Sequence, residues 1–94
     1  MAFSSVHNTH EKTIFDAVVA AAPGYPALAD DVELLADVAC VALNRMPSHY
    51  IRHSTDLAFF TTETERQAIR RKVEESVDFA FGYVQARHIM AARR

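Results

Sequence analysis

Three amphipathic stretches separated by prolines constrain the fold of this chain more than any other feature. The stretches are residues 8–22, 31–44 and 61–90, and the breaks are Pro23–Pro26 and Met46–Pro47. Apolar residues recur at spacings of three and four within each stretch, which is typical of helices, whereas two glycines and three prolines are too few for a series of hairpins. A chain of 94 residues has room for one core. We predict an all-α fold in a single domain, residues 1–94, with three main helices, a long C-terminal helix and a flexible segment 1–7.

The first predicted helix begins at Asn8, whose side chain can cap free amides while Glu11 matches the capping-box spacing. The break at Pro23–Pro26 ends it, because two prolines and a glycine do not continue a helix. One face carries the apolar residues that we expect to be buried: Ile14, Phe15, Val18, Ala21 and Ala22.

The second predicted helix starts near Asp30 or Asp31, where acids suit the positive end of the helix dipole. Its polar residues fall within about 60° of one another, and apolar residues cover the rest of the circumference. This pattern predicts a central helix that dominates the core. The polar stripe consists of Glu33, Asp37, Cys40 and Asn44.

Pro47 ends the second helix at Arg45–Met46, because the residue before a proline is pushed out of helical geometry. Residues 48–60 are predicted to be a connector, in which Leu57–Phe60 can form one short extended segment.

The third predicted helix opens at Thr61 or Thr62, where Thr62 and Glu65 match the capping-box spacing. The expected core face is Ile69, Val73, Val77, Ala80, Phe81, Val84 and His88, with His88 partly buried. A second apolar stripe, formed by Phe79, Tyr83, Ala86 and Met90, has no obvious partner within one chain. A helix of about 29 residues is about 43 Å long, so it either bends near Gly82 or packs on a second copy. We expect a homodimer with Phe79, Tyr83 and Met90 in its interface.

The composition excludes several classes of protein. The longest apolar runs are much shorter than the roughly 20 residues that cross a bilayer, and the N-terminus lacks the features of a secretory signal. We therefore expect a cytoplasmic protein without membrane contact. The single cysteine, Cys40, cannot form an internal disulfide or a cysteine zinc cluster and is expected to be a small packing residue. A net charge of −2 and a pI of 6.2 argue against bulk nucleic-acid binding.

The chain shows no pattern of catalytic residues. It has no glycine-rich phosphate loop, nucleophile elbow or metal-binding signature, so we predict that it is not an enzyme and has no cofactor. His49 and His53 have the spacing of two imidazole ligands, and Asp56 is a candidate third ligand. Because Pro47 makes a helix there doubtful, surface histidines are favoured and no metal site is predicted.

The residues at the end of the second helix combine cations with an aromatic ring. Arg45 and Arg52 flank Tyr50, with Asn44 and His49 close by. A guanidinium binds phosphate through two parallel hydrogen bonds and stacks on flat rings, and tyrosine offers a face to a nucleobase. This chemistry suits a small anionic nucleotide. In the alternative interpretation, the arginines pair with Glu33 or Asp37 at the surface and Tyr50 fills part of the core.

The segment 37–52, DVACVALNRMPSHYIR, resembles the "DV…ALN-x-(L/M)-P-P-x-Y" segment of the late-competence-development ComFB family. The layout agrees over about residues 8–90, with an amphipathic helix before this segment and a long helix after it. The resemblance implies a small, α-helical, dimer-forming bacterial protein, linked to competence and to the binding of cyclic di-GMP and cyclic di-AMP.

Carried onto this chain, the resemblance implies a ligand site that includes Asp37, Asn44, Arg45, Pro47, Tyr50 and Arg52, to which we add His49 as its neighbour. Arg45 and Arg52 are assigned to phosphate contact or purine stacking, and Tyr50 to stacking. Asn44 or Asp37 is assigned to base edges or to holding Arg45. Ser48 stands where the family often has a second proline, and a structural metal found in members with cysteine clusters is not carried over.

Two hypotheses follow. In the first, a homodimer binds a cyclic dinucleotide and changes its contacts with an unknown downstream protein. In the second, a dimer without a small ligand binds a partner helix through Phe79, Tyr83 and Met90. The second requires those side chains to be exposed and Arg45 to be tied to Glu33 or Asp37.

Overall fold

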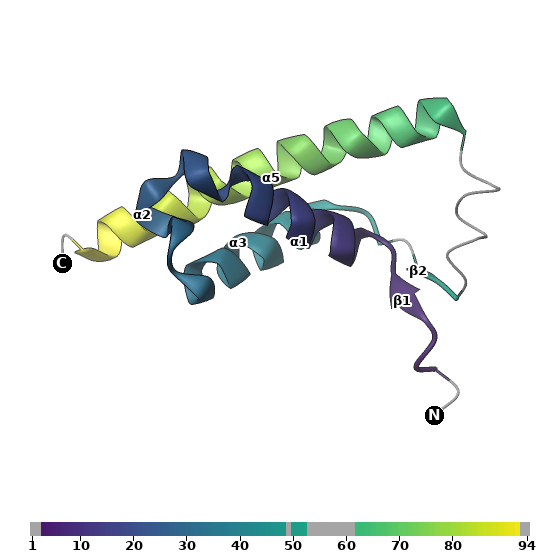
Figure 1. Cartoon of the computed structure of the whole chain (residues 1–94), viewed down its shortest axis with the longest axis horizontal. Helices are drawn as coiled ribbons and strands as arrows, with labels where there is room; N and C mark the ends of the chain where they lie inside the picture. Colours follow the sequence, from purple (N-terminus) through teal and green to yellow (C-terminus); the bar gives the residue numbers. More distant parts are fainter. Residues whose placement is uncertain (1–2, 49, 53–61, 93–94) are drawn as a thin grey trace.

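The computed structural model describes residues 3–48, 50–52 and 62–92 (Figure 1). Its elements are β1 (His7–Asn8), α1 (His10–Ala21), the 3-10 turn η1 (Ala22–Gly24), α2 (Pro26–Ala29), α3 (Val32–Arg45), β2 (Tyr50–Ile51) and α5 (Glu63–Ala92). The predicted all-α class, with three main helices and a long C-terminal helix, is confirmed. None of the helices in the described ranges is long and apolar enough to cross a membrane.

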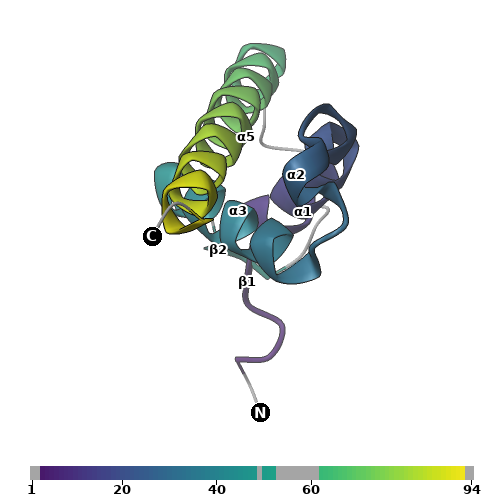
Figure 2. The ribbon, with the colours of Figure 1, turned by 90° about the vertical axis from the view of Figure 1, so that its left-hand side faces the viewer.

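The helices α1, α3 and α5 pack against one another around one core. In the end-on view, α5 lies on one side, α1 and α2 on the other, and α3 between and below them (Figure 2). The largest fully buried side chains are Phe81, Ile14, Leu28, Val38 and Ser76. The core therefore contains residues from every helix of the described chain, and α5 contributes its largest fully buried side chain, Phe81.

Helix α1 begins at His10, two residues later than predicted. Asn8 lies in β1, where its Oδ1 accepts a hydrogen bond from the His10 N–H at 3.0 Å. Ile14 and Val18 are buried as expected, but Phe15 is 48% exposed. The reason is that Phe15 lies about 100° round the helix from Ile14, beyond the width that α3 and α5 cover.

The Pro23–Pro26 break is more ordered than a simple turn. Pro26 occupies the first turn of the short helix α2, where its missing N–H costs no hydrogen bond. The ring of Tyr25 stacks on Phe81 with a centroid distance of 4.3 Å, and Leu28 is fully buried. The segment between α1 and α3 therefore packs against α5 through Tyr25 and contributes Leu28 to the core.

Helix α3 lies within one residue of the predicted bounds and contacts α1, α2 and α5, but α5 contributes more buried residues to the core. Asp31 caps it by accepting hydrogen bonds from the Glu33 and Leu34 amides at 3.0 and 3.1 Å. Its buried residues are Val38, Ala39 and Ala42, whereas Val32 is 80% exposed. Four further apolar residues of α3 are partly buried against the core: Leu34, Leu35, Val41 and Leu43. Cys40 is exposed, contrary to its expected packing role.

Helix α5 has the predicted capping box, in which Thr62 and Glu65 exchange backbone-to-side-chain hydrogen bonds at 3.4 and 3.1 Å. Its buried apolar residues are Val73, Val77, Ala80, Phe81 and Val84, as expected. His88 is exposed, contrary to expectation, because it lies beyond the last buried residue of this face. The helix shows no break at Gly82, and its first turns extend past the other helices (Figure 1).

The strands β1 and β2 pair in antiparallel register, with His7 opposite Ile51 and Asn8 opposite Tyr50. This pairing joins the segment before α1 to the segment after α3, and it includes His7 from the N-terminal segment 1–7. The extended segment predicted at Leu57–Phe60 lies outside the described residues.

Candidate functional site

The end of α3 is fixed against α5 by Met46. This residue caps α3 in an extended conformation (φ −87°, ψ 140°), as expected before Pro47. Its side chain is only 7% exposed, and its Sδ accepts a hydrogen bond at 3.5 Å from the hydroxyl of the buried Ser76. Arg45, the residue before this anchor, is therefore held beside α5.

The guanidinium of Arg45 lies over the ring of Phe79, 3.9 Å from its centroid. The Phe79 ring stacks with that of Tyr83 at a centroid distance of 6.0 Å, and the guanidinium of Arg87 lies 5.6 Å from the Tyr83 centroid. We call these four residues the arginine–aromatic ladder. Phe79 and Tyr83 are 44% and 45% exposed, so two rings flanked by two cations are accessible at the surface.

The arginine–aromatic ladder contains residues that the sequence analysis assigned to two different sites. Arg45 was predicted as a ligand-binding residue, whereas Phe79 and Tyr83 were predicted for a dimer interface. Met90, 63% exposed, continues the apolar stripe toward the end of α5. Ligand binding and protein docking would therefore use the same surface.

The alternative environments expected for Arg45 and Tyr50 differ from what the structure shows. Within the described parts of the chain, Arg45 forms no ion pair with Glu33 or Asp37. Tyr50 is 63% exposed and does not fill the core. A cation that rests on a ring without an acidic partner keeps its hydrogen-bond donors available to a ligand.

The other predicted ligand residues are distributed along the junction. Asn44 is exposed at the end of α3. Tyr50 belongs to β2, which pairs with β1 beyond the N-terminal end of α1, and the exposed Arg52 follows it (Figure 1). His49 and His53 lie outside the described residues. The structure thus places Tyr50 beside the β1 segment, whereas the guanidinium of Arg45, at the end of α3, lies against Phe79 of α5.

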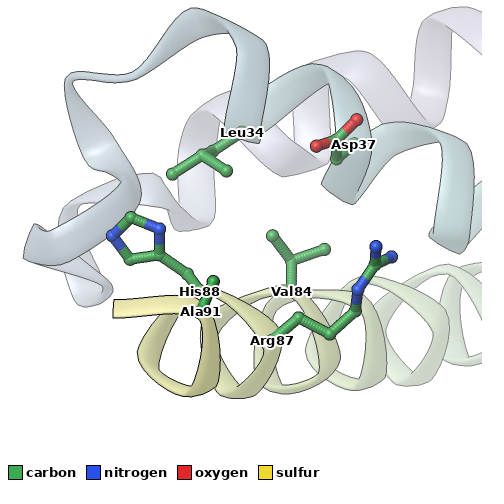
Figure 3. Close-up of a pocket in the computed structure, with 6 residues that line it drawn as sticks. All are labelled: Leu34, Asp37, Val84, Arg87, His88 and Ala91. Carbon is green, nitrogen blue, oxygen red and sulfur yellow. The ribbon is translucent and has the colours of Figure 1, made fainter. Parts of the chain in front are cut away.

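A pocket of about 190 Å³ lies between α3 and the C-terminal part of α5. Leu34 and Asp37 line it from α3, and Val84, Arg87, His88 and Ala91 line it from α5 (Figure 3). In this view Arg87 and His88 extend on either side of Val84, and the Arg87 guanidinium extends toward α3. Since Arg87 also belongs to the ladder, the pocket and the ladder form one continuous surface.

Asp37 is the one predicted ligand residue in the lining of this pocket. Within the described ranges, neither Asp37 nor Arg87 forms an ion pair or a hydrogen bond. The sequence interpretation missed Arg87, although its position four residues after Tyr83 places the two side chains on neighbouring positions of a helix face. That spacing is the signal that could have identified it.

No group of three or more histidine, cysteine, aspartate or glutamate side chains in the described parts of the chain could hold a metal ion. The surface offers cations, exposed rings, one carboxylate and a small apolar pocket. These groups are suited to binding an anionic ligand that has flat rings.

One comparison with known proteins identifies a family. The family model described as "Late competence development protein ComFB" matches residues 7–88 of the 94-residue chain. This range includes β1, α1, α3, α5 as far as His88, the whole arginine–aromatic ladder and the pocket lining except Ala91. No curated protein and no solved structure matches the chain.

Proposed function

Because the chain belongs to the ComFB family, we propose that it is a non-enzymatic receptor for a cyclic dinucleotide, cyclic di-GMP or cyclic di-AMP, acting in the cytoplasm. The family description relates it to late competence development. The observation that carries the proposal is the position of Arg45, whose guanidinium lies 3.9 Å from the centroid of the exposed Phe79 ring. A guanidinium held in this way can bind a phosphate at its edge while a ring supports its face.

The surface around Arg45 supports the same ligand class. Phe79 and Tyr83 offer exposed rings for purine stacking, and Arg87 offers a second cation next to the pocket. The ligand therefore has counterparts for both of its chemical parts, the phosphates and the bases.

The size of the pocket favours a dimer as the binding unit. A pocket that encloses a drug-sized ligand usually measures about 300–1,000 Å³, and the pocket between α3 and α5 measures about 190 Å³. One copy can enclose one base, not a whole dinucleotide. A two-fold dimer would present the same cations and rings twice, which matches the two phosphates and two purines of the ligand. Bound ligand would then alter the contacts of the dimer with a downstream protein.

Thermal unfolding with added ligand tests the proposal. At a ligand concentration 100 times the dissociation constant, binding to the folded state adds about 2.7 kcal/mol to the free energy of unfolding. With cyclic di-GMP or cyclic di-AMP at about 100 μM, we expect at least one to raise the melting temperature, since a receptor with micromolar affinity is then near saturation. Arg45→Ala should lose this shift, while Arg66→Ala, which removes a cation from the distant start of α5, should keep it. No shift with either ligand, confirmed by calorimetry, contradicts the proposal.

The exposed stripe of α5 favours a second candidate, a protein-interaction dimer without a small ligand, although the ion pair of Arg45 with Glu33 or Asp37 that was expected for it is not formed in the described parts of the chain. Phe79, Tyr83 and Met90 are 44%, 45% and 63% exposed, and an amphipathic partner helix could bury them. This candidate predicts that Arg45→Ala leaves partner binding intact, whereas Tyr83→Glu abolishes it.

A further inference from the structure

The pocket between α3 and α5 contains a carboxylate, which is unexpected in a site for an anionic ligand. Asp37 lines the pocket together with Arg87 and His88 (Figure 3). A carboxylate repels phosphate groups, so Asp37 opposes the attraction that Arg87 exerts on the ligand. Its presence favours binding only if it accepts hydrogen bonds from the uncharged part of the ligand, which is the base.

The oxygens of Asp37 are available for such hydrogen bonds. Asp37 is exposed, and it forms no ion pair or hydrogen bond within the described parts of the chain. An ionised carboxylate is an acceptor only and binds best to two adjacent donors. The apolar side chains of Leu34 and Val84, one from each helix, are placed to cover the faces of a flat ring in the same pocket.

The two purines differ in what they offer to a carboxylate. Guanine has two neighbouring donors, the N1–H and the N2 amino group, whose spacing matches the two carboxylate oxygens. Adenine has one amino donor beside N1, whose lone pair faces the second oxygen and is repelled by it. We propose that Asp37 binds the N1–H and N2–H donors of a guanine base, so that the protein prefers cyclic di-GMP to cyclic di-AMP; this inference rests on the proposed function.

The size of the preference follows from the number of matched hydrogen bonds. A two-point contact between a side chain and a base edge corresponds to a discrimination between about 5-fold and about 150-fold. We expect the dissociation constant of cyclic di-AMP to exceed that of cyclic di-GMP by a factor in this range. Cyclic di-IMP keeps N1–H and lacks the N2 amino group, so its affinity should fall between the two.

Isothermal titration calorimetry with the three ligands tests the inference on the full chain. In Asp37→Asn, the ratio of the cyclic di-AMP and cyclic di-GMP dissociation constants should fall toward one, because the amide replaces one acceptor by a donor. Glu33→Gln is the matched control, since it removes an exposed carboxylate from the same helix outside the pocket. It should change both affinities by the same factor and leave the ratio unchanged.

The outcomes separate this inference from the proposed function. Equal affinity for the two ligands, a preference for cyclic di-AMP, or an unchanged ratio in Asp37→Asn overturns the assignment of Asp37 and leaves the receptor proposal standing. Binding of neither ligand by the unmodified protein overturns both. Circular dichroism on both variants confirms that each retains the fold.

Discussion

Replacing Phe81 by alanine removes the largest fully buried side chain of the core. Phe81 is fully buried, and its ring stacks on Tyr25 with 6° between the ring planes. A Phe→Ala substitution in a packed core costs about 3–5 kcal/mol. A domain of this length has a free energy of unfolding of about 5–14 kcal/mol, from about 0.05–0.15 kcal/mol per residue. The substitution should therefore remove a large part of the stability.

Phe79→Ala is the matched control, because it makes the same chemical change two residues away on α5. Phe79 is 44% exposed and contacts the Arg45 guanidinium. An exposed cation–π contact contributes about 0.5–1 kcal/mol, and burial of roughly half of the ring adds about 1 kcal/mol. We expect Phe79→Ala to cost about 1–2 kcal/mol, clearly less than Phe81→Ala.

Urea denaturation followed by circular dichroism measures both effects. The midpoint should shift much more for Phe81→Ala than for Phe79→Ala, with similar m-values if both variants unfold in one transition. The protein concentration should be varied, because a dimer interface that contains Phe79 would add a concentration-dependent contribution. If Phe79→Ala costs as much as Phe81→Ala at low protein concentration, the assignment of one residue to the surface and the other to the core is wrong.

Other substitutions address the ends of α3 and the ladder. Asp31→Ala removes the cap that accepts two amide hydrogen bonds and should lower the free energy of unfolding by about 0.5–2 kcal/mol. Asp31→Asn should lower it much less in the same urea assay, because asparagine caps a helix about as well as aspartate. A double-mutant cycle with Arg45→Ala and Phe79→Ala should give a coupling of about 0.5–1 kcal/mol, and a coupling near zero would show that the guanidinium does not rest on the ring in solution. Tyr83→Glu should shift sedimentation toward the monomer, and an unchanged sedimentation coefficient would exclude this face from the dimer interface.

The local features of the fold could be predicted because they depend on neighbouring residues. The Asp31 cap, the end of α3 at Arg45–Met46 and the capping box at Thr62 each depend on hydrogen bonds within a few residues. The core face of α5 was also predictable, since its period is set by the helix itself.

The features that depend on how helices meet were less predictable. The pattern of α3 indicated a helix covered on nearly all sides, but its buried residues are Val38, Ala39 and Ala42, and Val32 is 80% exposed. The pairing of β1 with β2 joins residues more than 40 positions apart, and two-residue strands carry no recognisable alternation. The pocket is lined by Asp37 from α3 and Arg87 from α5. The sequence analysis predicted Asp37 as a ligand residue but not Arg87, because the packing of two helices brings them together.

If the ligand and the dimer interface both use the arginine–aromatic ladder, as proposed, ligand binding and assembly are coupled. A dimer formed through Phe79 and Tyr83 would bring Arg45 and Arg87 of one copy close to the same residues of the other, because these cations flank the rings. Four guanidinium groups in one interface repel one another, so the ligand-free dimer would be weak at low salt. A ligand with two phosphates between the copies would offset this repulsion. Binding linkage then requires that the ligand strengthens the dimer by the same factor by which dimer formation strengthens ligand binding, and this reciprocity would make the assembly itself the signal that a downstream protein detects.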